Sequence, residues 1–143
     1  YYRNILKTET QGVEVAGRVD LTDRFTLSAN YTWTDATTAA GANKGKQLVR
    51  RPEHMANLAA DYRWPVGLNT GVAVRYVGET FNNDANTQTV DEYTLVDLRA
   101  SYPIDENLEL YGRVENAFDE EYETVRNYGV PGRGFFAGVR VRY

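Results

Sequence analysis

Residues 94–102 read TLVDLRASY, a stretch in which uncharged, mostly apolar side chains alternate with mostly polar or charged ones. Successive side chains of a β-strand point to opposite faces of the sheet. Val96, Leu98 and Ala100 would therefore lie on one face, and Asp97 and Arg99 on the other. The stretch predicts a strand with one apolar face and one face in contact with water.

Six further stretches follow the same alternation: residues 13–21, 25–33, 56–64, 68–76, 108–116 and 135–143. Together with residues 94–102 they place 35 residues on the apolar face, and none of these is charged. The interleaved face has 28 positions, of which 13 are charged: Glu14, Arg18, Asp20, Asp61, Arg63, Arg75, Asp97, Arg99, Glu109, Arg113, Glu115, Arg140 and Arg142. We expect charge pairs between neighbouring strands on this wet face.

The connections between these strands alternate in length. Short turns rich in Pro, Gly, Asp and Asn fall at residues 22–24, 65–67 and 103–107, and long polar loops at residues 35–51, 78–92 and 119–134. Short periplasmic turns and long extracellular loops are typical of outer-membrane barrels. A tilted strand of about ten residues also spans the apolar band of that membrane, roughly 23 Å. The sequence thus predicts an all-β fold, a transmembrane antiparallel β-barrel in contact with outer-membrane lipid.

Seven strands are an odd number, whereas bacterial single-chain barrels have even strand counts. We therefore expect the chain to be part of a larger barrel, and the lack of an export signal at Tyr1 suggests sequence upstream. A mean hydropathy of -0.56 and the absence of a run of about 18 apolar residues exclude a transmembrane helix. The net charge of -4 argues against a nucleic-acid partner.

Aromatic side chains gather near both ends of the predicted strands, as in the interfacial girdles of membrane barrels. Phe25, Trp64 and Tyr102 lie near the turns, and Trp33 and Tyr76 lie toward the loops. The alternative fold is a soluble antiparallel sandwich with an ordinary core. A sandwich explains neither these two aromatic bands nor long loops at one end only.

Several motifs carry a family resemblance. They are QGVE at residues 11–14, NYTWTDA at 30–36, RPEH at 51–54, ENAFD at 115–119, YETV at 122–125 and GR at 132–133. The chain resembles the C-terminal barrel region of TonB-dependent outer-membrane receptors over essentially its whole length. The combination of LVRR at residues 48–51 with YETV at 122–125, Tyr128 and GR at 132–133 is most similar to the vitamin B12 transporter branch.

The resemblance implies a 22-stranded barrel closed by an N-terminal plug. Residues 1–143 would be its final seven strands, and the plug domain and the segment that contacts TonB would lie outside this chain. Such receptors import a large, scarce ligand with energy passed on by TonB. The ligand implied by the branch is cobalamin, and an iron-siderophore receptor is the alternative. No cofactor is expected.

Arg50 is the ligand-binding residue that the resemblance suggests, because its guanidinium can donate to amide or phosphate oxygens at the corrinoid periphery. Strand parity from Ala56 would turn Arg50 outward, so this role needs a break in register near Pro52. A solvated loop cation is the alternative. Residues 81–86 are a second candidate contact region, represented by Asn83, although this loop is shorter than the branch leads one to expect.

The last strand resembles the C-terminal signal that the barrel assembly machinery recognises. Its residues are Phe135, Val139, Val141 and the terminal aromatic Tyr143. The consecutive acids Asp119–Glu121 lack the spaced ligands of a calcium loop, so we expect a solvated acidic loop and no metal.

An enzyme and a structural or adhesive barrel are the alternatives to transport. An outer-membrane enzyme would need a nucleophile and a base, but His54 is the only histidine, cysteine is absent and no serine lies in a long loop. We therefore expect no catalytic residue. A structural or adhesive barrel needs neither a plug nor TonB. Sequence upstream of this chain would distinguish such a barrel from a transporter.

Overall fold

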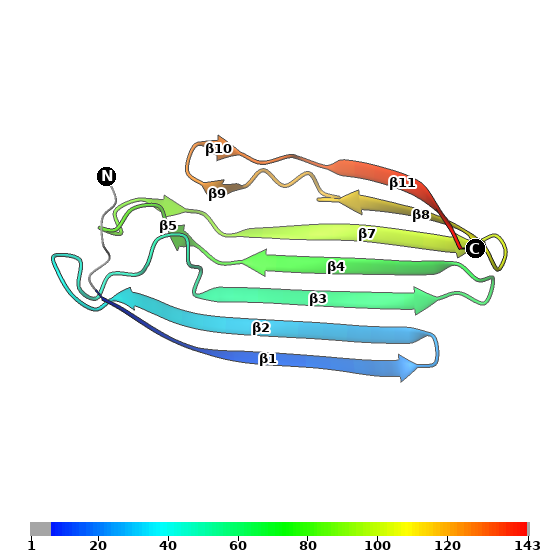
Figure 1. Ribbon diagram of the computed structural model, residues 1–143, viewed down its shortest axis with the longest axis horizontal. Coiled ribbons are helices and arrows are strands. Elements are labelled where there is room, and N and C mark those ends of the chain that lie inside the picture. Colours follow the sequence, from blue (N-terminus) through cyan, green and yellow to red (C-terminus); the bar gives the residue numbers. More distant parts are fainter. Residues whose placement is uncertain (1–6, 143) are drawn as a thin grey trace.

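Residues 7–142 are described in the computed structural model, and their regular structure is entirely β (Figure 1). The long strands are β1 (Thr8–Thr22), β2 (Phe25–Thr38), β3 (His54–Arg63), β4 (Asn69–Val77), β7 (Tyr93–Pro103), β8 (Leu108–Glu115) and β11 (Gly134–Val141). The short ones are β5 (Thr80–Phe81), β6 (Thr89–Val90), β9 (Glu123–Val125) and β10 (Tyr128–Gly129). Within residues 7–142, no helix is long and apolar enough to cross a membrane.

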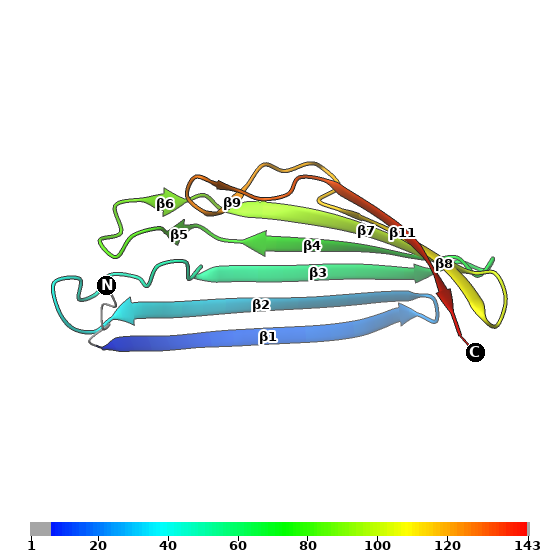
Figure 2. The same cartoon turned by 45° about the horizontal axis from the view of Figure 1, so that its top comes forward.

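The long strands form one antiparallel sheet in the order β1-β2-β3-β4-β7-β8-β11. Every long strand thus pairs with the next long strand along the chain. The sheet curves, and β8 and β11 run at an angle to β1–β3 (Figure 2). All seven predicted strands are present. Their ends differ from the prediction, most of all at β1 and β2, which continue together into the loop region.

The register brings the apolar side chains of all seven strands onto one face. One row of paired residues crosses the whole sheet: Val19, Leu27, Ala60, Val72, Leu98, Val114 and Phe135. These side chains are not covered by protein, since Val19 is 50% exposed, Leu98 41% and Phe135 72%. Among the described residues only two apolar side chains are buried, Ala36 and Val90. A sandwich would bury this face under a second sheet, so the sandwich alternative is wrong.

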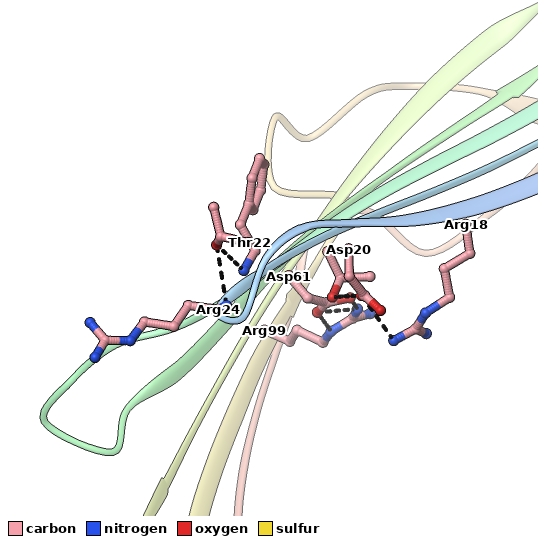
Figure 3. Close-up of polar contacts among 8 residues, drawn as sticks. Arg18, Asp20, Thr22, Arg24, Asp61 and Arg99 are labelled. Atoms are coloured by element: carbon pink, nitrogen blue, oxygen red, sulfur yellow. Dashed lines mark hydrogen bonds and ion pairs between the residues drawn. The ribbon is translucent and has the colours of Figure 1, made fainter.

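The neighbouring row lies on the opposite, polar face and consists of Asp20, Thr26, Asp61, Gly71, Arg99, Arg113 and Phe136. Thr26 Oγ1 donates to Asp20 Oδ1 at 2.5 Å, and the Arg99 guanidinium donates to the Asp61 carboxylate (Figure 3). Arg113 lies over the ring of Phe136, 4.5 Å from its centroid. The same strand register therefore aligns the polar and charged side chains on one face and the apolar side chains on the other.

Charge pairing on the polar face follows the prediction only in part. Arg140 donates to Glu109 at 2.8 Å between the neighbouring strands β11 and β8, as expected. Arg113 instead pairs with Glu115 of its own strand at 3.1 Å. Asp61 and Arg99 lie on β3 and β7, which are separated by β4. The prediction of charge pairs between neighbouring strands thus describes only some of the pairs, since others lie within one strand or reach across an intervening strand.

Short turns join the strands at one end of the sheet, where the right side of Figure 1 shows them. Thr22 Oγ1 accepts from the backbone N–H groups of Arg24 and Phe25, at 3.2 and 3.0 Å. Asp105 Oδ1 accepts from the N–H groups of Asn107 and Leu108, at 2.8 and 2.9 Å. Side chains of this type stabilise turns by replacing a backbone partner. They explain why so few residues suffice to reverse the chain here.

Candidate functional site

The three long connections lie together at the end of the sheet opposite the short turns (Figure 1). We call residues 39–53 the first loop, residues 78–92 the second loop and residues 116–133 the third loop. The second loop contains the paired strands β5 and β6, and the third contains β9 and β10. The sequence predicted both segments as irregular loops, so these two hairpins were missed. The loops form the candidate functional site because their side chains are not committed to the sheet.

The first loop folds back on the end of β2 before it turns toward β3. Thr37 pairs with Gln47, and the N–H of Leu48 donates to the Ala36 carbonyl at 2.8 Å. Arg50 follows in a left-handed conformation, with φ 57°, and its side chain is exposed. Because β3 begins at His54, strand parity does not extend to Arg50. The outward orientation expected from strict alternation therefore does not apply to it.

Asn83 organises the second loop from within. Its Oδ1 accepts from the N–H groups of Thr87 and Gln88, at 3.0 and 3.1 Å, and its Nδ2 donates to Thr87 Oγ1 at 2.7 Å. The Asn83 carbonyl accepts from the N–H of Asn86 at 3.0 Å. Nδ2 carries two hydrogens, so one donor remains for a ligand. The contact between Asn83 and a ligand stays a prediction.

The first and second loops are fastened to each other by hydrogen bonds. The N–H of Arg50 donates to the Phe81 carbonyl at 2.9 Å. The Asn86 side chain accepts from the N–H of Gln47 at 2.7 Å and donates to the Gln47 carbonyl at 3.0 Å. Sequence reasoning placed Asn86 in a candidate ligand-contact region, residues 81–86, but did not predict its contact with Gln47. Its only signal was the turn composition of FNNDAN at residues 81–86, which does not show which partner a turn residue will meet.

Asn116 and Asp119 form the base of the third loop. Asn116 is 5% exposed with φ 50°, and its side chain exchanges two hydrogen bonds with the backbone of Glu120, at 2.9 and 2.8 Å. Its own N–H donates to Asp97 Oδ1 at 2.9 Å. Asp119 Oδ1 accepts from the N–H of Arg133 at 2.8 Å. The ENAFD and GR motifs therefore meet in space and close the loop onto β8 and β11.

Acidic side chains line a hollow of about 590 Å³ between the second and third loops. Its carboxylates come from Asp91, Glu92, Asp119, Glu120, Glu121 and Glu123. In the part of the chain that the structure describes, no three His, Asp or Glu side chains are grouped closely enough to hold a metal ion. The hollow gives this part of the loop layer a negative charge.

His54 is engaged in the band of aromatic residues at the loop end of the sheet. Its Nδ1 lies 2.7 Å from the Tyr31 hydroxyl, and the two rings stack with centroids 6.1 Å apart. Tyr31 belongs to the adjacent strand β2, so this contact holds the His54 ring in place at the loop end of the sheet.

The residues proposed as an assembly signal lie on the last strand. Phe135, Val139 and Val141 all belong to the apolar face, and they are 72%, 55% and 62% exposed. Tyr143 lies outside the described residues. Recognition of this strand by the assembly machinery stays a prediction.

Comparison with known proteins places these features in a family. A family model described as TonB dependent receptor-like, beta-barrel matches residues 1–117. The chain is 32% identical over 145 residues to the vitamin B12 transporter BtuB of Photobacterium profundum, covering 98% of the chain and 22% of that protein. It is 37% identical over 99 residues to the ferrioxamine receptor of Yersinia enterocolitica, covering 68% of the chain and 14% of that receptor.

The fold is also found among solved structures. The siderophore receptor PiuA from Acinetobacter baumannii superimposes with a TM-score of 0.84 at 23% identity, covering 95% of this chain and 22% of that one. The ferric yersiniabactin uptake receptor FyuA from Yersinia pestis gives 0.81 at 18% identity, covering 94% and 23%. The chain thus spans about a fifth of the length of most of these proteins.

Proposed function

This chain belongs to the family of TonB-dependent receptor-like β-barrels and is part of a bacterial outer-membrane protein, and we propose that the complete protein imports a large ligand with energy supplied through TonB. The seven strands would form the C-terminal part of the barrel wall. The plug and the segment that contacts TonB would come from outside residues 1–143. The apolar face would meet membrane lipid and the polar face the barrel interior.

The proposed ligand is vitamin B12. The supporting observation is that the similarity to a vitamin B12 transporter extends over 98% of this chain, including all three loops. Similarity to the ferrioxamine receptor is higher in identity but covers only 68%. Barrel strands are constrained by the membrane whatever the cargo, so likeness that includes the loops carries more information about the ligand.

The charge distribution of the loops is compatible with this ligand. The first loop carries the cations Lys44, Lys46, Arg50 and Arg51, whereas the hollow beside the third loop is acidic. A ligand that touches both regions is favoured if its net charge is small and if it presents donors and acceptors. The peripheral amides of cobalamin do so, whereas a strongly anionic ferric complex would be repelled by the acidic hollow.

Arg50 is the residue proposed to contact the ligand. Its backbone is held by the hydrogen bond to Phe81, while its guanidinium is exposed at the surface of the loop layer. A guanidinium presents five N–H donors in a planar fork and suits amide and phosphate oxygens. Asn83 is proposed as a second contact through its remaining Nδ2 hydrogen.

The experiment is to measure binding of cyanocobalamin to the full-length receptor with Arg50→Ala. Loss of one or two charged hydrogen bonds should weaken binding about tenfold. Arg24→Ala is the matched control, because Arg24 lies at the turn end of the sheet, away from the loops. Unchanged affinity in Arg50→Ala would remove Arg50 from the ligand site.

A siderophore is the second candidate ligand, favoured by the 37% identity to the ferrioxamine receptor. The same preparation would be titrated with ferrioxamine B, a cationic complex that the acidic hollow would not repel. Binding of ferrioxamine without binding of cyanocobalamin would replace the first proposal by the second.

A further inference from the structure

We propose that Asn86 is a positioning residue that joins the first and second loops into a single ligand-binding unit. Two hydrogen bonds connect its side chain to the backbone of one residue, Gln47: Gln47 N–H donates to Asn86 Oδ1 at 2.7 Å, and Asn86 Nδ2 donates to the Gln47 carbonyl at 3.0 Å. The joining of the two loops does not depend on the proposed function, whereas the placement of Arg50 against a ligand rests on it.

The Asn86 amide acts here as one peptide unit of an added strand. Gln47 already pairs on its other side with Thr37 at the end of β2. A primary amide is the side-chain group that offers a carbonyl acceptor and an N–H donor side by side, as a peptide does. The hydrogen-bond pattern of β2 therefore continues from Thr37 through Gln47 to a side chain of the second loop.

The conformation of the second loop presents this amide to Gln47. Asn86 has φ 54°, a left-handed conformation that asparagine adopts more readily than most residues. Its N–H donates to the Asn83 carbonyl at 3.0 Å, and Asn83 in turn binds the backbone of the two residues after Asn86. The turn at residues 83–88 is thus held by hydrogen bonds of its own, in addition to those that join it to the first loop.

Arg50 is the functional residue that this contact would place. It lies three residues after Gln47, and its N–H donates to the carbonyl of Phe81 in the same second loop. The first loop is therefore held at two points, Gln47 and Arg50, by two residues five positions apart. Loss of the Asn86 contact leaves one backbone hydrogen bond between these stretches and lets Arg50 move relative to the second loop.

The test measures the distance between the loops directly. The full-length receptor in lipid vesicles would carry nitroxide labels at Ala42 and Ala85, which are exposed on the first and second loops, and any cysteine outside this cysteine-free chain would be replaced. We expect a narrow distance distribution with Asn86 intact. Asn86→Gly should broaden it, because glycine tolerates the positive φ while removing only the amide.

Asn127→Gly is the matched control. Asn127 also has a positive φ, 62°, but it lies in the third loop. Within residues 7–142 its side chain makes no hydrogen bond to the first or second loop, and its N–H donates to Glu123. It should leave the distribution narrow. A narrow distribution in Asn86→Gly, or equal broadening in both variants, would overturn the proposal.

Asn86→Asp should make the width of the distance distribution depend on pH, which general loosening of the loop would not do. At neutral pH the carboxylate accepts from Gln47 N–H but repels the Gln47 carbonyl, so the distribution should be broad. Below the usual carboxyl pKa of about 3.9 the acid can donate and accept like the amide, and the distribution should narrow. Glu53, whose carboxylate accepts from the Gln47 side chain, and Asp84 in the same turn are the neighbouring acidic groups, so the wild-type receptor is acidified in parallel. Breadth at both pH values would contradict the proposal.

Cyanocobalamin affinity then shows whether the contact serves Arg50. If Asn86→Gly lowers the competent fraction of the loops to about one fifth, apparent affinity falls about fivefold. In the Arg50→Ala background the same change should have little further effect. Equal effects in both backgrounds would contradict positioning of Arg50. Absence of any cyanocobalamin binding would reject the proposed ligand, while the label distances still decide the role of Asn86.

Discussion

Asp61 and Arg99 form an ion pair that passes over the strand between them. Arg99 Nη2 donates to Asp61 Oδ1 at 2.5 Å and to Oδ2 at 2.7 Å, although β3 and β7 are each paired with β4 and not with each other. Gly71 occupies the position between them, and a Cβ there would lie 2.5 Å from Asp61 Oδ1 and from Arg99 Nε. A missing side chain on β4 thus makes the contact between its two neighbours possible.

Gly71→Ala should separate this ion pair. Both side chains are about half exposed, so loss of the ion pair costs about 0.5–1 kcal/mol of unfolding free energy. The added methyl group would also lie 2.9 Å from Arg99 Cγ, so the whole Arg99 side chain has to shift as well as the Asp61 carboxylate. Urea unfolding of the full-length receptor in vesicles measures the cost. Gly17→Ala is the control, because a Cβ at Gly17 meets open space. In the background of Asp61→Asn, Gly71→Ala should cost less; an equal cost would show that the ion pair is not responsible.

Leu98→Arg tests contact of the apolar face with lipid. Leu98 is in the middle of β7 and 41% exposed, and an arginine near the bilayer midplane costs about 2–4 kcal/mol. Val139→Arg on β11 should also destabilise the receptor. Ala59→Arg, on the polar face, is the control and should cost far less. Equal stability of Leu98→Arg and Ala59→Arg in vesicles would be incompatible with lipid on the apolar face.

Asn116→Ala should release the third loop. It removes two hydrogen bonds to Glu120 and places an alanine at φ 50°, which together cost about 2–3 kcal/mol of local stability. Limited proteolysis of residues 119–133 in the full-length receptor detects the opening. Asn116→Gly removes the same hydrogen bonds without the backbone strain, so its protection should be intermediate. Protection unchanged in both variants would show that the loop is held elsewhere.

Deletion of Tyr143 should impair assembly of the full-length receptor into the outer membrane. The expectation comes from the sequence, in which an aromatic residue ends the alternating strand of Phe135, Val139 and Val141. Surface labelling of the receptor in cells measures correct insertion. Tyr143→Phe keeps the aromatic ring and should insert normally. Normal insertion of the deletion variant would remove the signal from this residue.

The strands and their faces were predictable because one rule, the exclusion of charge from every second position, acts along all of them. Leu98 and Asp97 were assigned to opposite faces from the sequence, and the register confirms both assignments. Strand ends were less predictable. Trp64, expected inside a strand, lies just after β3, where its Nε1 donates to Thr70 Oγ1 at 2.9 Å.

The loops could not be derived in the same way. Their conformation depends on asparagines with positive φ, such as Asn86 and Asn116. The Asn86 side chain binds the backbone of Gln47, which is distant in sequence, and the Asn116 side chain binds the backbone of Glu120, four residues later. Composition indicates that such residues favour turns, but it does not identify their partners. The motif around Asn116 carries a family resemblance in the sequence, but only the structure shows that Asp119 joins it to Arg133.

The uncovered apolar face has a consequence for how this sequence can diverge. In a packed interior each side chain limits the volume of its neighbours, so substitutions must compensate one another. In the proposed arrangement the outward side chains along the row from Val19 to Phe135 face fluid acyl chains instead, which adapt to differences in size and shape. Valine, leucine, alanine and phenylalanine can therefore replace one another there nearly independently. Evolutionary drift on this face is restricted by polarity far more than by shape.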